Sequence, residues 1–216
     1  MAERPVFVPS VRGSRLVSEI PIQFAWSPGM APSQKKKNIL ALHEGAAQRG
    51  IVPVLEISSK SELEAGRRLS AFHLKSRVYG KETTVECLFQ GSKVFELGGP
   101  FEDLYFSDSR SARGDQRLKN SGKLVAFSLE ATRYPLVPAT AFYDWIYINA
   151  LYPHREWLER LNSYGGFTDI EFNPERSLNC QARSMAIFIS LGARGVLDDA
   201  VESFDAFRSI LEFGHI

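Results

Sequence analysis

Apolar and polar residues alternate along several short stretches of the chain. In EIPIQFAW, every second side chain from Ile20 to Trp26 is apolar. Because successive side chains of a strand point to opposite faces, this pattern predicts a half-buried strand. Other β-branched or aromatic runs also predict extended structure, namely PVFVPSV, IVPVLEIS, a region near Phe72 and LVAFSLEATRYPLV, and KSRVYGKET is typical of a hairpin.

Longer stretches carry apolar residues three and four positions apart, the spacing of one helix face. Ser33 is a suitable N-cap for a helix from Gln34 to Gln48, and Ser177 for a helix with a nearly apolar interior over 182–191. Further helices are predicted around 109–120, over 141–166 with a break near Pro153, and over 196–214. Because strands and helices do not alternate regularly, the sequence predicts an α+β fold, mostly helical around a small sheet.

The stretch TTVECLFQGSKVFELGG places one carboxylate, Glu86, among apolar residues. On a helix that begins near Thr84 and ends at 98–100, Glu86, Gln90 and Lys93 stand at i, i+4 and i+7 and share one face. Burying a carboxylate costs several kcal/mol unless it is hydrogen-bonded, paired or protonated. Glu86 is therefore either a paired structural residue or a reactive one.

Two further groups of charged residues are candidates for a catalytic or binding role. In FTDIEFNPERS, Asp169 and Glu171 alternate with apolar residues, which predicts a strand that ends at 173–174. Lys35, Lys36 and Lys37 fall in the first turn of a predicted helix, where they oppose the helix dipole. An anionic ligand would remove that conflict, and the alternative is a solvated charge run.

Composition narrows the class of protein. The chain has 216 residues, of which 44% are hydrophobic and 24% charged, with a formal charge of +1, so a globular domain is expected but a strongly basic protein is not. The two cysteines, Cys87 and Cys180, suggest no disulfide framework. The four histidines, including His215, do not cluster as metal ligands. The common nucleotide-binding and hydrolase motifs are absent from the sequence. We expect no cofactor and no metal. Without a signal peptide or an apolar run of about 18 residues, we expect a cytoplasmic protein without membrane contact.

Four segments together carry a resemblance to a known family: SAFHL, VECLFQGSKVF, YDWIYINAL and DIEFNPERSLNCQA. They resemble the NADAR family, which includes the bacterial N-glycosidase of riboflavin-pathway intermediates. In the family pattern VEHxFQAxKF, the matching residues are Glu86, Phe89, Gln90, Lys93 and Phe95. Cys87 stands where many members have His, and FNPERS replaces a WG-type segment, which weakens the carry-over to Glu171.

The resemblance covers residues 68–192, and the whole layout is similar to NADAR antitoxins encoded beside DNA ADP-ribosyltransferase toxins. It implies one domain over 1–216, with amino-terminal strands and a Lys-rich helix (1–67), the family core (68–192) and a C-terminal helix (193–216). It also implies an ADP-ribosyl glycohydrolase that removes ADP-ribose from guanine bases of DNA or RNA, with ADP-ribose as product and a toxin as partner. An N-glycosidase of a small phosphorylated metabolite and a non-catalytic ADP-ribose-binding module remain as alternatives.

Cleavage of an N-glycosidic bond develops positive charge on the ribose, so it needs a carboxylate and a proton donor. A lysine that forms a Schiff base with the opened ribose is a second route. On this basis the predicted catalytic residues are Glu86, Lys35, Lys36, Asp169 and Glu171. The predicted ligand-binding residues are Trp26, Phe72, Gln90, Lys93, Trp145 and Asn179, for which core packing or a satisfied buried amide is the alternative.

Overall fold

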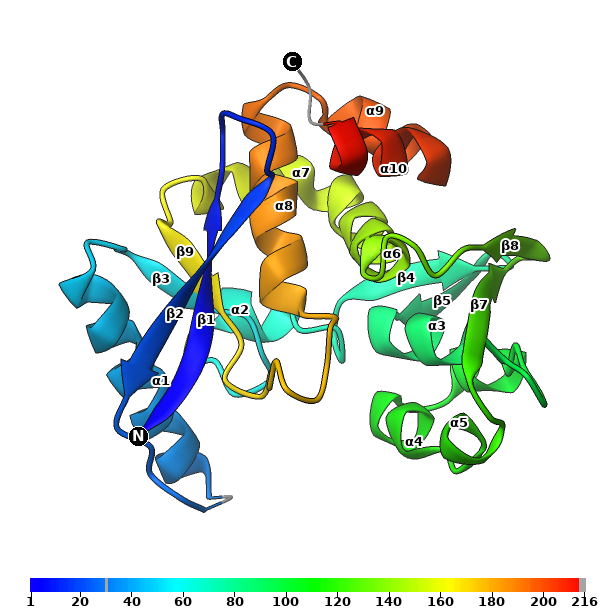
Figure 1. Cartoon of the computed structure of the whole chain (residues 1–216), viewed down its shortest axis with the longest axis horizontal. Coiled ribbons are helices and arrows are strands. Elements are labelled where there is room, and N and C mark those ends of the chain that lie inside the picture. Colours follow the sequence, from blue (N-terminus) through cyan, green and yellow to red (C-terminus); the bar gives the residue numbers. More distant parts are fainter. Residues whose placement is uncertain (30, 214–216) are drawn as a thin grey trace.

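The computed structural model describes residues 1–29 and 31–213, so His215 lies outside the described residues. Helices and small sheets are mixed without regular alternation (Figure 1), and the predicted α+β class is confirmed. In this part of the chain, no helix is long and apolar enough to cross a membrane.

One sheet has the strand order β2-β1-β9-β3. Its strands are β1 (Ala2–Pro9), β2 (Val17–Phe24), β3 (Val54–Glu56) and β9 (Gly166–Thr168). β1 pairs antiparallel with β2 and β9, whereas β3 pairs parallel with β9. The alternation of β2 is real, since Ile22 and Phe24 are buried between exposed neighbours and pack with Leu42 of α1 (Pro32–Gln48). The first two predicted strands are therefore confirmed.

Helix α1 begins one residue before the predicted cap. Its N-cap is Ala31, without a side-chain hydrogen bond, and Pro32 occupies the first turn, so the prediction of Ser33 as N-cap is wrong. Proline suits this position because its φ is already helical and its missing N–H has no partner there anyway.

A second layer consists of helices in the middle of the molecule (Figure 1). α8 (Gln181–Ala193) contacts both β1 and β9 on one side and α6 (Ala141–Leu151) on another. The predicted break near Pro153 is confirmed, because η2 (Tyr152–His154), α7 (Arg155–Leu158) and η3 (Glu159–Leu161) follow α6. Ser177 is not the cap of α8, whose N-cap is Cys180.

The predicted C-terminal helix is divided in two. α9 (Leu197–Glu202) and α10 (Phe204–Phe213) are separated by Ser203, which is extended. Its hydroxyl accepts a hydrogen bond from the N–H of Ala206, so Ser203 acts as a cap that starts a new helix.

The remaining part contains a hairpin, a three-stranded sheet of order β6-β7-β8 and short helices. The predicted hairpin is confirmed, but Phe72 lies in a turn before it, and the predicted helix over 109–120 is two helices. The elements are α2 (Glu64–Arg68), β4 (Lys75–Val78), β5 (Lys81–Thr84), α3 (Val85–Gly91), β6 (Lys93–Phe95), η1 (Glu102–Phe106), α4 (Ser109–Gly114), α5 (Arg117–Asn120), β7 (Leu124–Leu129) and β8 (Thr132–Tyr134).

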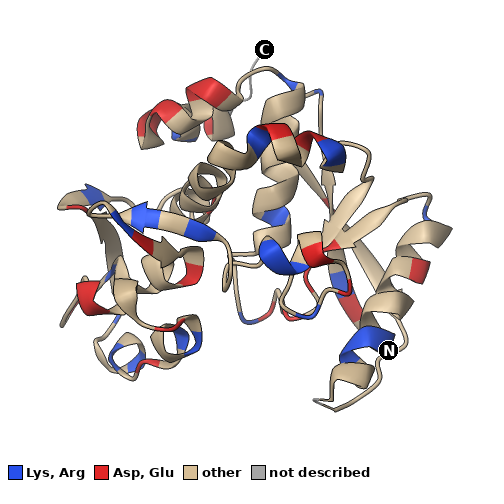
Figure 2. Ribbon diagram, turned by 180° about the vertical axis from the view of Figure 1, so that it is seen from behind, with Lys and Arg blue, Asp and Glu red and all other residues tan. Residues whose placement is uncertain are grey.

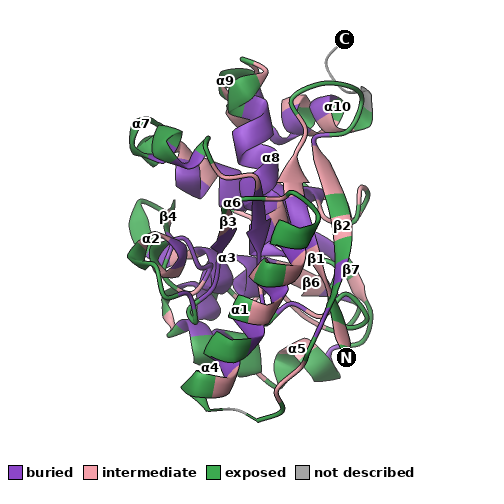
Figure 3. Ribbon diagram, turned by 90° about the vertical axis from the view of Figure 1, so that its left-hand side faces the viewer, coloured by how far each residue is buried: buried purple, intermediate pink, exposed green. Residues whose placement is uncertain are grey.

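One large apolar cluster joins these parts, with members from Phe7 to Ile210. Figure 3 shows that buried residues dominate α3, α6 and α8, while α4 and α9 are largely exposed. Helix α3 therefore lies in the buried centre of the molecule, and the turn that follows β9 begins from a fully buried strand.

Candidate functional site

Helix α3 begins as the sequence predicts. The hydroxyl of Thr84 accepts a hydrogen bond from the N–H of Cys87 at 3.2 Å, and every residue of the helix is buried. The helix ends at Gly91, and the chain then turns into β6. Glycine is required at this position, because a side chain there would lie 2.5 Å from the ring of Tyr105. The predicted end at 98–100 is therefore wrong, and Lys93 belongs to a strand.

The three polar residues of this segment nevertheless form a row. The amide nitrogen of Gln90 donates to Oε1 of Glu86 at 2.9 Å, and Nζ of Lys93 donates to Oε1 of Gln90 at 2.6 Å. Glu86 is 6% exposed and forms no salt bridge with any described residue. Burial raises the pKa of Glu86, although Gln90 and the charges of Arg113 and Lys93 oppose that shift.

Arg113 of α4 is a site residue that no pattern in the sequence predicted. Its guanidinium carbon lies 5.7 Å from the ring centroid of Phe72. The pKa of Lys93 is lowered to about 8, because burial and the positive charge of Arg113 lower it and together outweigh the opposing charge of Glu86. Among the described residues, neither Lys93 nor Arg113 has a carboxylate in a salt bridge. Arg113 thus lies beside the partly exposed ring of Phe72, whereas Nζ of Lys93 lies 4.6 Å from the ring centroid of the buried Phe89.

The second group of polar residues lies in the turn after β9. The strand ends at Thr168, and the N–H of Phe172 donates to the carbonyl of Asp169, so the predicted strand through residue 172 is wrong. The turn forms because the Asp169 carboxylate accepts the N–H of Glu171 at 3.0 Å, and Glu56 accepts the N–H of Ile170 at 2.9 Å.

Burial raises the pKa of Asp169, and the negative charge of Glu56 raises it further. Hydrogen bonds from the Glu171 backbone and the Gln181 side chain oppose the shift because they favour the charged form. The Gln181 amide donates to Oδ2 of Asp169 at 2.9 Å. Asp169 is therefore a weaker acid than usual that still has two N–H donors.

Helix α1 brings one of the predicted lysines to this turn. Lys35 is 8% exposed, and its Nζ lies 2.9 Å from Oε1 of Glu171 and 5.8 Å from the ring centroid of Trp26. The buried Asn38 fixes the nearby loop, since its side chain bonds both the N–H and the carbonyl of Ser27. Lys36 points elsewhere and pairs with Glu62, and both side chains are about half exposed.

One backbone residue connects the two groups. The N–H of Ala71 donates to Oε1 of Gln181 at 2.7 Å, and the carbonyl of Ala71 accepts the N–H of Glu86 at 3.0 Å. Burial raises the pKa of Tyr143 well above its usual value, and the charges of Glu86 and Asp169 both add to that shift. Glu86 and Asp169 therefore lie on either side of the segment 70–72. We define the candidate site as the following residues: Glu86, Gln90, Lys93, Arg113, Phe72, Asp169, Glu171, Lys35, Trp26 and Gln181.

Two predicted binding residues have other positions. Trp145 packs between Tyr134 and Phe204, with ring centroids 5.5 and 5.7 Å away, and so belongs to the apolar contact with α10. Asn179 comes two residues before Gln181, and its Oδ1 is buried without a protein partner in the described structure. Gln181 is a site residue that the sequence analysis missed, although it stands only two residues after Asn179.

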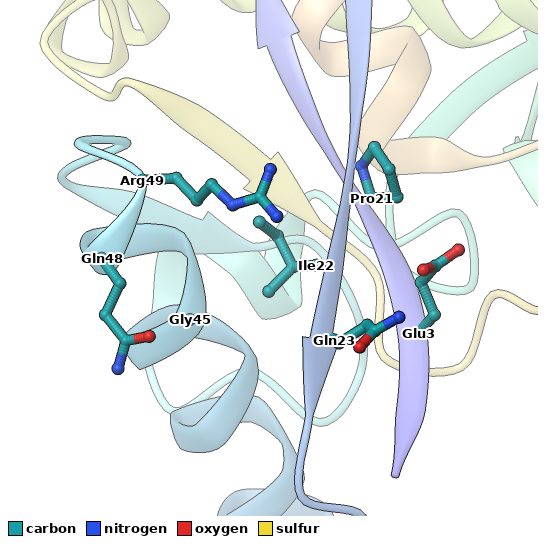
Figure 4. A pocket seen from close by; sticks show the side chains of 7 residues that line it. All are labelled: Glu3, Pro21, Ile22, Gln23, Gly45, Gln48 and Arg49. Atoms are coloured by element: carbon teal, nitrogen blue, oxygen red, sulfur yellow. The ribbon is translucent and has the colours of Figure 1, made fainter.

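Two surface hollows lie outside the candidate site. One of about 310 Å³ lies between α1 and the first two strands, with Glu3, Gln23 and Arg49 among its side chains (Figure 4). Another of about 420 Å³ is lined by residues of 68–75 and 154–158. The first contains none of the predicted site residues, and the second borders the segment 70–72.

The chain matches a known family model. No curated protein matches the chain. The family model described as "DarT1-associated NADAR antitoxin" matches residues 2–215, nearly the whole sequence. The chain therefore belongs to the family of DarT1-associated NADAR antitoxins.

Proposed function

We propose that this protein is an ADP-ribosyl glycohydrolase that removes ADP-ribose from guanine bases of nucleic acid, and that it thereby acts as the antitoxin of a DarT1-type ADP-ribosyltransferase. The observation that carries this proposal is the pair of carboxyl groups with raised pKa values, Glu86 and Asp169, joined through Ala71 and Gln181. Family membership supports the antitoxin role and the toxin partner.

The two carboxyl groups suit different steps of the hydrolysis. Glu86 accepts only the amide of Gln90, so its neutral form is favoured and it donates a proton to the departing guanine nitrogen. Burial and the charge of Glu56 raise the pKa of Asp169 to about 8, close to neutral pH, which suits a general base that takes a proton from the attacking water. The bond from the ribose carbon to nitrogen breaks, and the water oxygen bonds to that carbon.

Lys35 and Glu171 allow a covalent alternative. Lys35 would first transfer a proton to Glu171, 2.9 Å away, because only the neutral amine is a nucleophile. The ribose ring opens, the amine adds to C1 of the ribose, and the guanine nitrogen leaves with a proton. Water then hydrolyses the resulting Schiff base to ADP-ribose and free lysine. Borohydride added during turnover tests this route. It should label Lys35 if a Schiff base forms and leave the protein unlabelled if hydrolysis is direct.

The remaining residues of the candidate site are suited to binding the diphosphate and the bases of the substrate. Lys93 and Arg113 have no carboxylate partners among the described residues and lie close to the proton donor, so they can hold an anion. The rings of Phe72 and Trp26 are partly exposed and can stack on a base. Lys36 and Trp145 have no part in this proposal because their side chains are engaged elsewhere.

An oligonucleotide with one ADP-ribosylated guanine tests the proposal. Wild-type protein should return the unmodified oligonucleotide and free ADP-ribose, resolved by gel and mass spectrometry. Glu86→Gln and Asp169→Asn should each slow this release. Tight binding of ADP-ribose without release would instead support a non-catalytic module. Inactivity on the oligonucleotide with cleavage of a small phosphorylated N-glycoside would support the metabolite enzyme.

A further inference from the structure

The hollow of about 420 Å³ has a composition suited to nucleic acid. Its lining residues are Arg68, Leu69, His73, Leu74, Lys75, His154, Trp157 and Leu158, none of which is acidic. Leu69, Leu74 and Leu158 are buried and form an apolar floor. The side chains around that floor are cationic, imidazole or indole, the types that contact phosphates and bases.

The hollow adjoins the candidate site through the chain itself. Arg68 and Leu69 directly precede the segment 70–72, and His73 directly follows it, while Ala71 within the segment bonds Gln181 and Glu86. The carbonyl of Leu69 accepts the hydroxyl of the buried Tyr147 at 2.6 Å, which fixes this stretch of backbone. The hollow and the candidate site therefore share one continuous stretch of chain, residues 68–73.

The positive charges of the hollow are available to phosphate. Arg68 pairs with Glu64 at 2.6 Å and Lys75 with Glu82 at 3.0 Å, but all four side chains are more than 45% exposed. Exposed pairs of this kind are worth little and exchange readily for another anion. In the view from behind, α2, β4 and α7 each contain Lys or Arg (Figure 2), and α2 and α7 also contain an acidic residue.

Trp157 supplies an aromatic surface at the edge of the hollow. Its side chain is 38% exposed, and the guanidinium carbon of Arg160 lies 4.6 Å from its ring centroid. An exposed indole beside a guanidinium is a stacking platform for an unpaired base.

We propose that this hollow binds the nucleotide flanking the ADP-ribosylated guanine in a single-stranded nucleic acid. The identity of the modified base rests on the proposed function, whereas the affinity for the strand does not. The hollow then makes the enzyme prefer a modified strand to a modified mononucleoside.

Two substrates and two double variants test this proposal. Arg68→Ala with Lys75→Ala removes two charges from the hollow, and Arg12→Ala with Lys119→Ala removes two exposed charges elsewhere as the control. We expect the first variant to raise KM for the modified oligonucleotide about 10- to 100-fold and to reduce the salt slope of binding by about two. Cleavage of ADP-ribosyl guanosine should change less than about twofold in both variants.

Trp157→Ala should weaken binding of the strand about 10-fold, and Trp157→Phe should restore most of it, because the ring is what stacks. Thermal melting identifies any variant that is unfolded. Equal KM values for the hollow and control variants would overturn the proposal, as would stronger binding of a duplex than of single strands.

The proposed function can fail independently. If wild type cleaves neither substrate, fluorescence anisotropy with unmodified 12-nucleotide DNA and RNA strands still tests the hollow. Loss of that binding in the Arg68 and Lys75 variant alone would support the inference, and binding equal to that of the control variant would reject it. Comparison of the DNA and RNA arms shows which strand is preferred.

Discussion

The molecule buries two glutamates, Glu56 at 2% exposure and Glu86 at 6% exposure, and burial raises the pKa of both. Their hydrogen bonding differs. Glu56 accepts the hydroxyls of Ser58 and Thr168 and the N–H of Ile170, whereas Glu86 accepts one amide, from Gln90.

This difference separates a structural carboxyl from a reactive one. Three donors around Glu56 offset much of the cost of burying it, and they also fix the turn that carries Asp169. Glu86 has fewer donors and lies near two cations, Lys93 and Arg113, that lack carboxylate partners in the described structure. Burial alone does not distinguish the two residues, but the number of accepted hydrogen bonds does.

The largest expected effect is on catalysis at Glu86. Glu86→Gln should lower kcat on the modified oligonucleotide about 100- to 10,000-fold, because it removes a proton donor and keeps the shape of the side chain. Glu56→Gln should instead lower the free energy of unfolding by about 1 to 3 kcal/mol, since its amide group faces donors. Urea unfolding and single-turnover rates measure the two effects. Similar losses of kcat in both variants would remove the distinction.

The next effect concerns the network around Glu56 at acid pH. Nε2 of His43 lies 2.9 Å from the hydroxyl of Thr168, which itself donates to Glu56, so His43 is the donor in that bond. Burial lowers the pKa of His43 from 6.5 to about 4. Its contribution to stability is therefore fully present above pH 6.5 and is lost as the pH falls through about 4.

We expect protonation of His43 to cost the wild type up to about 3 kcal/mol over that pH range. His43→Gln keeps a donor to Thr168 but cannot gain the charge, so it should be more acid-resistant than wild type. Urea unfolding of both proteins at pH 7 and pH 4 measures this. Parallel stability curves would contradict the prediction.

A smaller effect separates the two predicted lysines. Lys35→Ala should reduce kcat/KM about 10- to 100-fold, because it leaves Glu171 unpaired beside Asp169. Lys36→Ala is the matched control and should stay within about twofold of wild type, since its pair with Glu62 is exposed. A larger loss of kcat/KM in Lys36→Ala than in Lys35→Ala would contradict the assignment of Lys35 to the site.

The smallest effect is a gain in stability. Because burial raises the pKa of Glu86 in the folded protein, this residue does not lower the free energy of unfolding below pH 4.5, where it is neutral in both states. As the pH rises through the folded-state pKa, the unfolded chain ionises more readily, and the free energy of unfolding falls. Glu86→Gln should therefore be more stable than wild type at pH 8, by about 1 kcal/mol, and no more stable at pH 4. An inactive variant that is also less stable at pH 8 would indicate that Glu86 is a structural residue.

Local patterns in the sequence were sufficient for much of the fold. The alternation in 20–26, the cap at Thr84 and the four-residue spacing of Glu86 and Gln90 depend on neighbours in the chain. The wrong N-cap at Ser33 has a local cause, Pro32, but the wrong strand end has a distant one. Strand β9 ends at Thr168 because the carboxylate of Glu56, far earlier in the sequence, accepts a hydrogen bond from the N–H of Ile170.

The α+β class, the family and the pair of Glu86 and Gln90 on one face of α3 could thus be predicted from the chain alone, because they follow from short periodic patterns and one spaced motif. Which side chains meet depends on how these elements pack. Arg113 near Lys93, Ala71 between Gln181 and Glu86, and the choice of Lys35 over Lys36 depend on contacts between segments far apart in the chain. Such contacts leave no spacing in the sequence, because they depend on how helices and turns are oriented against one another.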